Sequence, residues 1–123
     1  ITDRLLSVPY ICIINLKINK MLDAIKNLFG LEKTDYAELV KKGAIIVDVR
    51  SKSEFASGHV KNAINIPVNE LQNNLSRLKD KNKTIITCCA SGMRSASAKG
   101  ILQNNGYTDV HNGGGWMSLN NKL

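Results

Sequence analysis

The chain has 123 residues, enough for one domain with a buried core, and its 43% apolar and 22% charged residues are ordinary for a globular protein. Its formal net charge is +7, but the lysines are scattered and no aromatic residues interleave with them, which argues against a nucleic-acid-binding surface. Three cysteines without a C-x-x-C pair or a His/Cys cluster argue against a disulfide framework and predict no metal site. We therefore expect reduced thiols and a cytoplasmic location.

Residues 1–20 differ in character from the rest of the chain. Their apolar stretch, Leu5 to Leu16, is too short to cross a bilayer, so no membrane span is expected. Three interpretations stay open: an extra strand docked on the domain, an extension without a function, or a degenerate export signal, which would make the protein an exported one. We divide the chain into an N-terminal extension of uncertain role, residues 1–30, and one folded domain, residues 31–123.

From residue 33 onward, the patterns of helices and strands alternate. TDYAELVKKG predicts a helix that ends at Gly43, because glycine readily adopts the left-handed conformation found after helices. The run Ala44–Val49 is short, apolar and rich in β-branched residues, which is typical of a strand buried on both faces. Ser51 and Glu54 have the spacing of a capping box, so a short helix should start there and end at Gly58.

The second half of the chain continues this alternation. Leu71, Leu75 and Leu78 recur with the spacing of one helix face, which predicts a helix with a buried stripe. A further helix is expected over 91–105. The other predicted elements are strands near 62–67, 84–88 and 107–112, and a glycine turn at 113–115 followed by a helical turn. Strands that alternate with helices at this spacing indicate an α/β domain with a mainly parallel sheet.

The stretch TCCASGMRSA, residues 87–96, joins a predicted strand to a predicted helix. Ligands of open parallel sheets bind beyond the carboxyl ends of the strands, and the start of a helix offers unpaired N–H groups to an anion. The small residues of this loop allow the backbone to curl around one centre, and Arg94 adds a permanent cation. A cysteine at that centre would have a lowered pKa, which makes it a candidate nucleophile.

Two adjacent cysteines compete for that position. Successive strand residues point to opposite faces of the sheet, so Cys88 and Cys89 cannot both face the loop. Counted from Cys89, the third residue is Gly92 and Arg94 closes a loop of six residues. Counted from Cys88, the third residue is Ser91 and the loop is one residue longer. The glycine favours Cys89 as the nucleophile and Cys88 as a small buried hydrophobe.

Several motifs in this order resemble the rhodanese-like domain family, from roughly residue 31 to the end of the chain. IIVDVRSKSEFASGHVKNAINIP matches the entry signature of that family, and TIITCCASGMRSASAKGILQNNGYTDVHNGGG matches its second half. The resemblance implies a three-layer α/β fold with a five-stranded, mainly parallel sheet flanked by helices. It also implies that Cys89 accepts sulfane sulfur as a persulfide. The substrate-binding residues implied by the motif form the loop: Ala90, Ser91, Gly92, Met93, Arg94 and Ser95.

Loop length distinguishes two related chemistries. Rhodanese-type sulfurtransferases have an active loop of six residues, whereas the related dual-specificity phosphatases of the Cdc25 class have seven, which leaves room for phosphate. Cys89 to Arg94 is six residues, so a single-domain sulfurtransferase is the favoured interpretation. A phosphatase or arsenate reductase of the related type stays open as an alternative. So does a module that relays sulfur or senses persulfide without turnover.

The reaction implied by the resemblance needs neither a metal nor an organic cofactor. The Cys89 thiolate would attack the outer sulfur of thiosulfate or a similar small anionic donor, and sulfite would leave. Cyanide, a cellular thiol or a thioredoxin-like protein would then accept the sulfur. Asp48 and Arg50 bracket a strand end, where we expect an ion pair that braces the active loop, with substrate contact by Arg50 as the alternative. The sequence indicates no particular oligomeric state.

Overall fold

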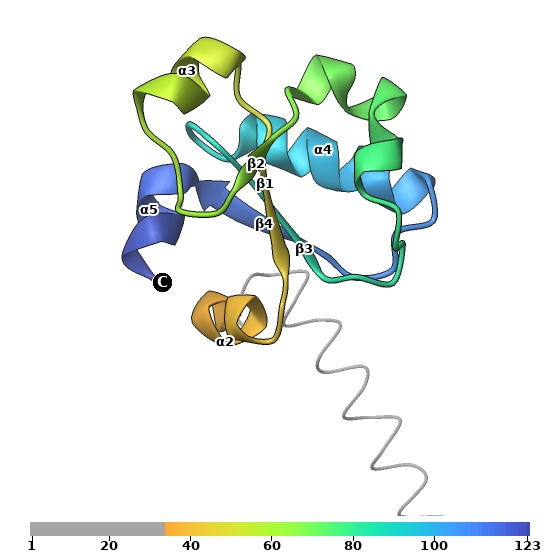
Figure 1. The fold of residues 1–123 in the computed structure, drawn as a ribbon, viewed down its shortest axis with the longest axis horizontal. Helices are drawn as coiled ribbons and strands as arrows, with labels where there is room; N and C mark the ends of the chain where they lie inside the picture. The colour runs from red at the N-terminus through yellow and green to blue at the C-terminus, as the bar shows by residue number, and fades with distance from the viewer. Residues whose placement is uncertain (1–33) are drawn as a thin grey trace, which may run out of the picture. The chain divides into compact units, whose positions relative to one another are not determined.

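The computed structural model describes residues 34–123, which form a parallel sheet with helices on both faces (Figure 1). The strands are β1 (Ile45–Asp48), β2 (Ile64–Asn65), β3 (Ile85–Cys89) and β4 (Val110–Gly115). The α-helices are α2 (Tyr36–Lys41), α3 (Lys52–Ser57), α4 (Met93–Asn104) and α5 (Trp116–Asn121), and two 3₁₀ helices are η1 (Val68–Asn73) and η2 (Leu75–Arg77). The interpretations of residues 1–20 lie outside the described residues.

The strand order is β2-β1-β3-β4, and every neighbouring pair is parallel. The predicted α/β class with a parallel sheet is confirmed, although residues 34–123 form four strands where the family resemblance implied five. The chain moves outward from β1 to β2 and then crosses to the other side of β1 to form β3. The carboxyl ends of β1 and β3 therefore meet at a switch point, where Asp48 lies opposite Cys88.

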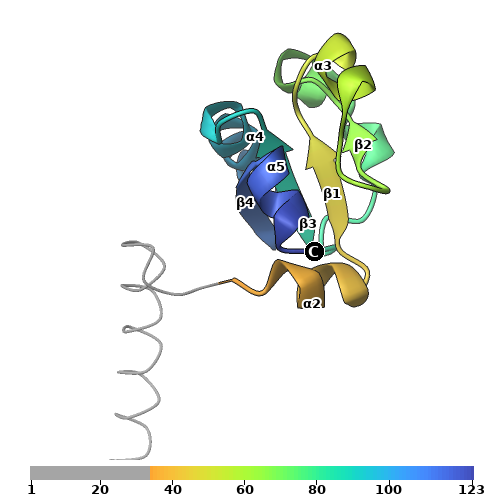
Figure 2. The same ribbon diagram turned by 90° about the vertical axis from the view of Figure 1, so that its left-hand side faces the viewer.

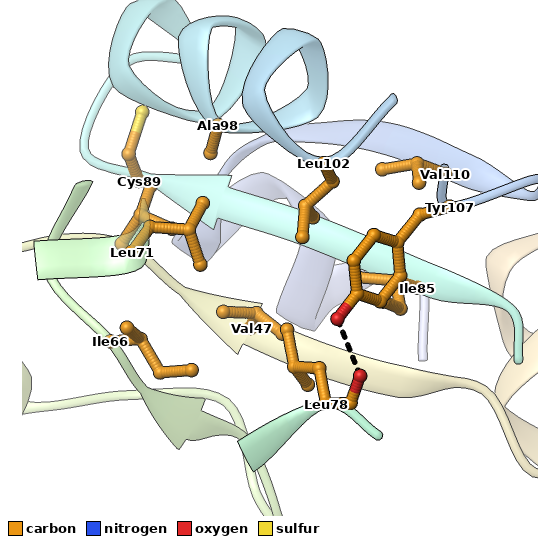
Figure 3. Close-up of a cluster of buried hydrophobic side chains, with 11 residues drawn as sticks. Val47, Ile66, Leu71, Leu78, Ile85, Cys89, Ala98, Leu102, Tyr107 and Val110 are labelled. Atoms are coloured by element: carbon orange, nitrogen blue, oxygen red, sulfur yellow. Dashed lines mark hydrogen bonds between the residues drawn. The ribbon is translucent and has the colours of Figure 1, made fainter. Parts of the chain in front are cut away.

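Each face of the sheet has its own apolar cluster. One cluster lies between the sheet and the elements α4, η1 and η2, and Figure 3 shows Ala98 and Leu102 of α4 pointing toward the strands. Its buried members are Val47, Val49, Ile66, Leu71, Leu78, Ile85, Cys89, Ala98, Leu102, Tyr107 and Val110. The opposite cluster includes Ile46, Ile86, Cys88 and Leu119, with residues of α2 packed against it. In Figure 2, α3 lies beyond the arrowhead of β1, and α2 lies near the opposite end of that strand.

The turn and cap residues behave largely as the sequence predicts. Gly43 follows α2 with a φ of +102°. At the start of α3, the Ser51 hydroxyl accepts a hydrogen bond from the Glu54 N–H at 3.3 Å, and a Glu54 carboxylate oxygen accepts one from the Ser51 N–H at 3.2 Å. The capping box is therefore complete, and α3 ends with Gly58 as its C-cap.

The predicted helix with Leu71, Leu75 and Leu78 on one face is replaced by η1 and η2. Leu71 and Leu78 are buried, so the apolar positions are right but the secondary structure is wrong. The break lies at Asn74, whose side-chain amide donates to the Glu70 carbonyl at 2.8 Å. Such a local side-chain bond to the backbone competes with regular helical pairing.

The triple glycine was expected to form a turn, but it continues strand β4. A Cβ atom on Gly113 would lie 2.9 Å from both the Ile86 Cγ2 atom and the Thr87 carbonyl oxygen. A Cβ atom on Gly115 would lie 2.9 Å from the Ala90 carbonyl oxygen. The glycines therefore allow β4 to lie against β3 and the loop after it, and the predicted helical turn follows as α5.

This packing predicts opposite outcomes for two glycine-to-alanine substitutions. Gly113→Ala should destabilise the protein by about 1–3 kcal/mol, because the new methyl group meets backbone and side-chain atoms that have little room to move. Gly100→Ala, within α4, should stabilise it by roughly 0.5–1 kcal/mol, because nothing lies within 4 Å of the added Cβ atom. Urea denaturation of the two variants measures both effects, and a neutral Gly113→Ala would contradict the close approach of β4.

Candidate active site

The loop between β3 and α4 turns at a single residue in a left-handed conformation. β3 ends at Cys89 and α4 begins at Met93, so only three residues connect them. The last of these, Gly92, is the N-cap of α4 and has a φ of +104°, a region that side chains disfavour. In this conformation the Gly92 N–H donates a hydrogen bond of 2.9 Å to the Cys89 Sγ atom. The glycine therefore directs a backbone donor toward the sulfur.

The two adjacent cysteines lie in different environments. Cys88 packs with the cluster that contains Ile86 and Leu119, whereas Cys89 belongs to the cluster on the opposite face. Burial, followed by the negative charge of Asp48, raises the pKa of the Cys88 thiol to about 12. Cys88 is therefore a neutral, buried thiol at physiological pH, whereas Cys89 faces the loop and the start of α4.

The pKa of Cys89 is shifted in the opposite direction. Burial has the largest individual influence and raises the pKa of its thiol. The Ser95 hydroxyl and backbone N–H groups oppose burial, and their combined effect lowers the pKa below its ordinary value. The backbone donors belong to Ser95, Gly92 and Ser91. The loop thus favours a thiolate, the nucleophilic form of cysteine, although the side chain of Cys89 has 0% exposure.

Ser95 connects this sulfur to β4. In the thiol form, Cys89 Sγ donates to the Ser95 Oγ atom over 3.4 Å. The Ser95 hydroxyl lies 3.0 Å from the Gly92 carbonyl oxygen and 2.6 Å from the Asn112 Oδ1 atom. Because a hydroxyl has one hydrogen, a thiolate at Cys89 competes with these two oxygens for it. The Asn112 side-chain amide also donates to the Gly92 carbonyl at 3.4 Å and thereby ties β4 to the loop.

The guanidinium of Arg94 does not bond to Cys89 but pairs with Glu54 of α3. Its Nη1 and Nη2 atoms donate to the two carboxylate oxygens at 2.8 and 3.0 Å. This pair, with further hydrogen bonds from Ser51, holds the pKa of Glu54 at about 2. Arg94 also lines a surface cavity of about 450 Å³. The other residues of the cavity wall are Val49, Ser51, Lys52, Ser53, Pro67, Val68, Asn69 and Glu70.

Asp48 and Arg50 form a buried ion pair at the end of β1. The Arg50 Nη2 atom lies 2.6 Å from the Asp48 Oδ2 atom. The same guanidinium donates to the carbonyl oxygens of Glu54 at 3.2 Å and Gly58 at 2.6 Å, and it lies 4.7 Å from the centre of the Trp116 ring. Within residues 34–123, the side-chain hydrogen bonds of Arg50 all go to residues 48–58. The pair holds α3 in place, and α3 carries the partner of Arg94.

The predicted loop residues are therefore brought together only in part. The N–H groups of Ser91 and Gly92 and the hydroxyl of Ser95 surround the Cys89 sulfur. Ala90 is exposed, and the side chain of Met93 is 80% exposed and faces solvent. A direct bond from Arg94 to a bound donor would use the N–H groups that Glu54 leaves free.

Two residues of this site were not identified from the sequence. The sequence pattern predicts only a helix cap at Glu54, because a capping box gives no sign of a second partner forty residues later. For Asn112 the sequence pattern predicts only a place in the final strand. One local signal could have indicated a role for Asn112, namely its position directly before a run of glycines. Glycines have no side chains, so the loop after β3 can lie close to this part of β4.

Neither a metal site nor a membrane helix occurs in the described part of the chain. Within residues 34–123, no three His, Cys, Asp or Glu side chains gather as metal ligands would. Among the same residues, every helix is too short or too polar to cross a membrane.

Known proteins are similar to this chain in sequence and in structure. Thiosulfate sulfurtransferase PspE of Escherichia coli is 41% identical over 74 residues, which covers 59% of this chain and 71% of PspE. A tRNA sulfurtransferase of Thermoplasma acidophilum is 35% identical over 69 residues, 56% of this chain, but the match spans only 14% of that larger protein. The solved structure of an Escherichia coli rhodanese with anions superposes with a TM-score of 0.59 and 38% identity, covering 62% of this chain and 91% of that one.

The profile of one protein family extends over the whole described domain. It matches residues 32–122, from just before α2 to the end of α5. The match includes the strand-to-helix loop with Cys89 and the segment that carries Glu54. The chain belongs to the rhodanese-like domain family.

Proposed function

We propose that the protein is a single-domain sulfurtransferase that moves sulfane sulfur through a persulfide on Cys89. The observation that carries this proposal is the lowered pKa of Cys89, whose sulfur lies 2.9 Å from the Gly92 N–H at the start of α4. The similarity to PspE, a thiosulfate sulfurtransferase, supports thiosulfate or a related small anion as the donor. The six-residue loop from Cys89 to Arg94 is the length expected for sulfur rather than phosphate transfer.

In the first step, the Cys89 thiolate attacks the outer sulfur of thiosulfate. The new bond joins Cys89 Sγ to that sulfur, the sulfur–sulfur bond of thiosulfate breaks, and its electron pair leaves with sulfite. The N–H groups of Ser91 and Gly92 stabilise negative charge on the loop side of the sulfur. Arg94, five residues after Cys89, steadies the anionic donor with the N–H groups that Glu54 leaves free.

In the second step, a nucleophilic acceptor takes the outer sulfur. Cyanide attacks the outer persulfide sulfur through carbon and leaves as thiocyanate, which regenerates the thiolate. A cellular thiol or a thioredoxin-like protein would attack in the same way and carry the sulfur as its own persulfide. Free, reduced Cys88 and Cys89 fit a reducing compartment such as the cytoplasm, where we place the protein.

Replacement of either cysteine tests which one carries the sulfur. Cys89→Ser should lower thiosulfate:cyanide sulfurtransferase activity at least about a thousandfold, because a hydroxyl at this position forms no persulfide. Cys88→Ala should keep most of the activity, because the Cys88 thiol is neutral and faces the opposite side of the sheet. Mass spectrometry after thiosulfate treatment should find one added sulfur on wild type and Cys88→Ala alone. Activity that survives Cys89→Ser but not Cys88→Ala would refute the assignment.

The pH dependence of the first step tests the role of Ser95. The rate should follow the thiolate fraction, rising with pH through the pKa of Cys89 and then levelling off. Ser95→Ala removes a group that lowers this pKa, so the rise should move to higher pH. The rate at neutral pH should then fall by about tenfold, the value of a hydrogen bond to a charged group.

Ser97→Ala is the matched control for Ser95→Ala. Ser97 lies two residues further along α4 and is exposed, so its pH profile should superimpose on that of the wild type. The difference in ultraviolet absorbance between a protein with Cys89 and its Cys89→Ser counterpart during a pH titration gives the Cys89 pKa independently of turnover. An unchanged thiolate titration in Ser95→Ala would show that the hydroxyl does not stabilise the anion.

A further inference from the structure

The cation expected to bind the sulfur donor already has an anionic partner. Arg94 on α4 and Glu54 on α3 form two hydrogen bonds, Nη1 to Oε1 at 2.8 Å and Nη2 to Oε2 at 3.0 Å. Both side chains are 38% exposed, so the pair lies at the surface, where an incoming anion can reach it. A two-point contact of this kind matches the geometry that Arg94 would use to bind an oxyanion.

The carboxylate of Glu54 is held in position by more than Arg94. Its Oε1 atom accepts hydrogen bonds from the Ser51 N–H at 3.2 Å and from the Ser51 hydroxyl at 3.0 Å. With a pKa of about 2, Glu54 keeps its negative charge across the physiological pH range. The main chain of Glu54 is fixed as well, since its carbonyl accepts a hydrogen bond from the buried Arg50. Glu54 is thus a fixed negative charge rather than a surface carboxylate that moves freely.

The cavity beside Arg94 would otherwise attract anions. Lys52 and Arg94 supply positive charge to its wall, and Glu70 supplies one negative charge. Glu54 is bonded to the Arg94 guanidinium and cancels much of its field, while the Nε–H and the outer hydrogens of Nη1 and Nη2 stay unused by this pair. An anion in the cavity therefore finds hydrogen-bond donors on Arg94 but little net charge.

We propose that Glu54 is a specificity-determining residue, because its carboxylate competes with anionic sulfur donors for the Arg94 guanidinium. This inference rests on the proposed sulfurtransferase function. It means that the site binds a doubly charged donor such as thiosulfate less tightly than the Arg94 charge alone would allow. Donors with less negative charge are affected less by this competition, so Glu54 narrows the difference in binding affinity between doubly and singly charged donors.

The test replaces the charge and keeps the helix cap. Glu54→Gln preserves the capping box, because glutamine also serves at the third position of a helix, while it removes the negative charge beside Arg94. Glu38→Gln is the matched control, because Glu38 occupies the same position in α2, three residues after its N-cap Asp35, and pairs with Lys42 instead. Both variants change the net charge by the same amount, so a general electrostatic effect would appear in both.

Two measurements follow. In the Cys89→Ser background, sulfate binding by calorimetry should tighten about threefold to fivefold on Glu54→Gln, the range expected for losing a surface ion pair. With Cys89 present, the KM for thiosulfate should fall by about the same factor. The KM for a singly charged organic thiosulfonate, which gives up its outer sulfur and leaves as a sulfinate, should fall by a smaller factor. Glu38→Gln should change neither value. In the Arg94→Ala background, Glu54→Gln should no longer tighten sulfate binding.

The outcomes separate this inference from the proposed function. If the wild type fails to transfer sulfur from any donor, the proposed function is wrong, and the sulfate titrations still measure the competition at Arg94. A second outcome is that the wild type turns over thiosulfate while Glu54→Gln fails to tighten sulfate binding, whether the affinity is equal, weaker or not measurable. Only the inference is then overturned, because Glu54 positions Arg94 instead of competing for it. A tightening that persists without Arg94 would also overturn it.

Discussion

The chain must leave β3 and enter α4 within three residues, and it does so through the left-handed backbone of Gly92. This conformation brings an N–H group to 2.9 Å from the Cys89 sulfur and places Ser95 of the first helical turn beside it. A residue with a side chain would be strained at this φ, and its Cβ atom would also lie 3.4 Å from the Gly114 Cα atom. The acidity of Cys89 therefore depends on backbone geometry more than on any single charged side chain.

The switch point of the sheet organises the charges around that loop. The Asp48–Arg50 pair at the end of β1 is buried, and Arg50 holds two carbonyl groups of the segment that forms α3. Through this contact the buried pair fixes the helix that carries Glu54, and Glu54 in turn holds Arg94 in the first turn of α4. The expected ion pair between Asp48 and Arg50 is present. That it braces the active loop stays a prediction, and the contacts of Arg50 point to a route through α3.

The sequence predicted the fold class, the capping box and the position of the loop between β3 and α4, because these depend on local patterns. Periodicity located the buried leucines, but it could not show that Asn74 would interrupt a helix between Leu71 and Leu78 by bonding to the backbone. The glycines of β4 suggest a turn when only the sequence is considered. Glycine is needed there because β3 and the adjoining loop leave no room for side chains, and the sequence does not show that contact. The Arg94–Glu54 pair joins residues forty positions apart, and only the tertiary fold brings them together.

The burial of Cys89 has a consequence for the lifetime of a sulfur-loaded protein. Its sulfur is acidic and hence reactive, yet its side chain has 0% exposure in this structure. Different features therefore control the reactivity of the Cys89 thiol and its access to solvent. Hydrogen bonds lower its pKa, whereas burial limits its contact with molecules in solution. Oxidants and small thiols in solution would therefore have little access to the Cys89 sulfur. The partner that exchanges sulfur fastest would then be the one that best gains access to the Cys89 sulfur, not the one that is the strongest nucleophile.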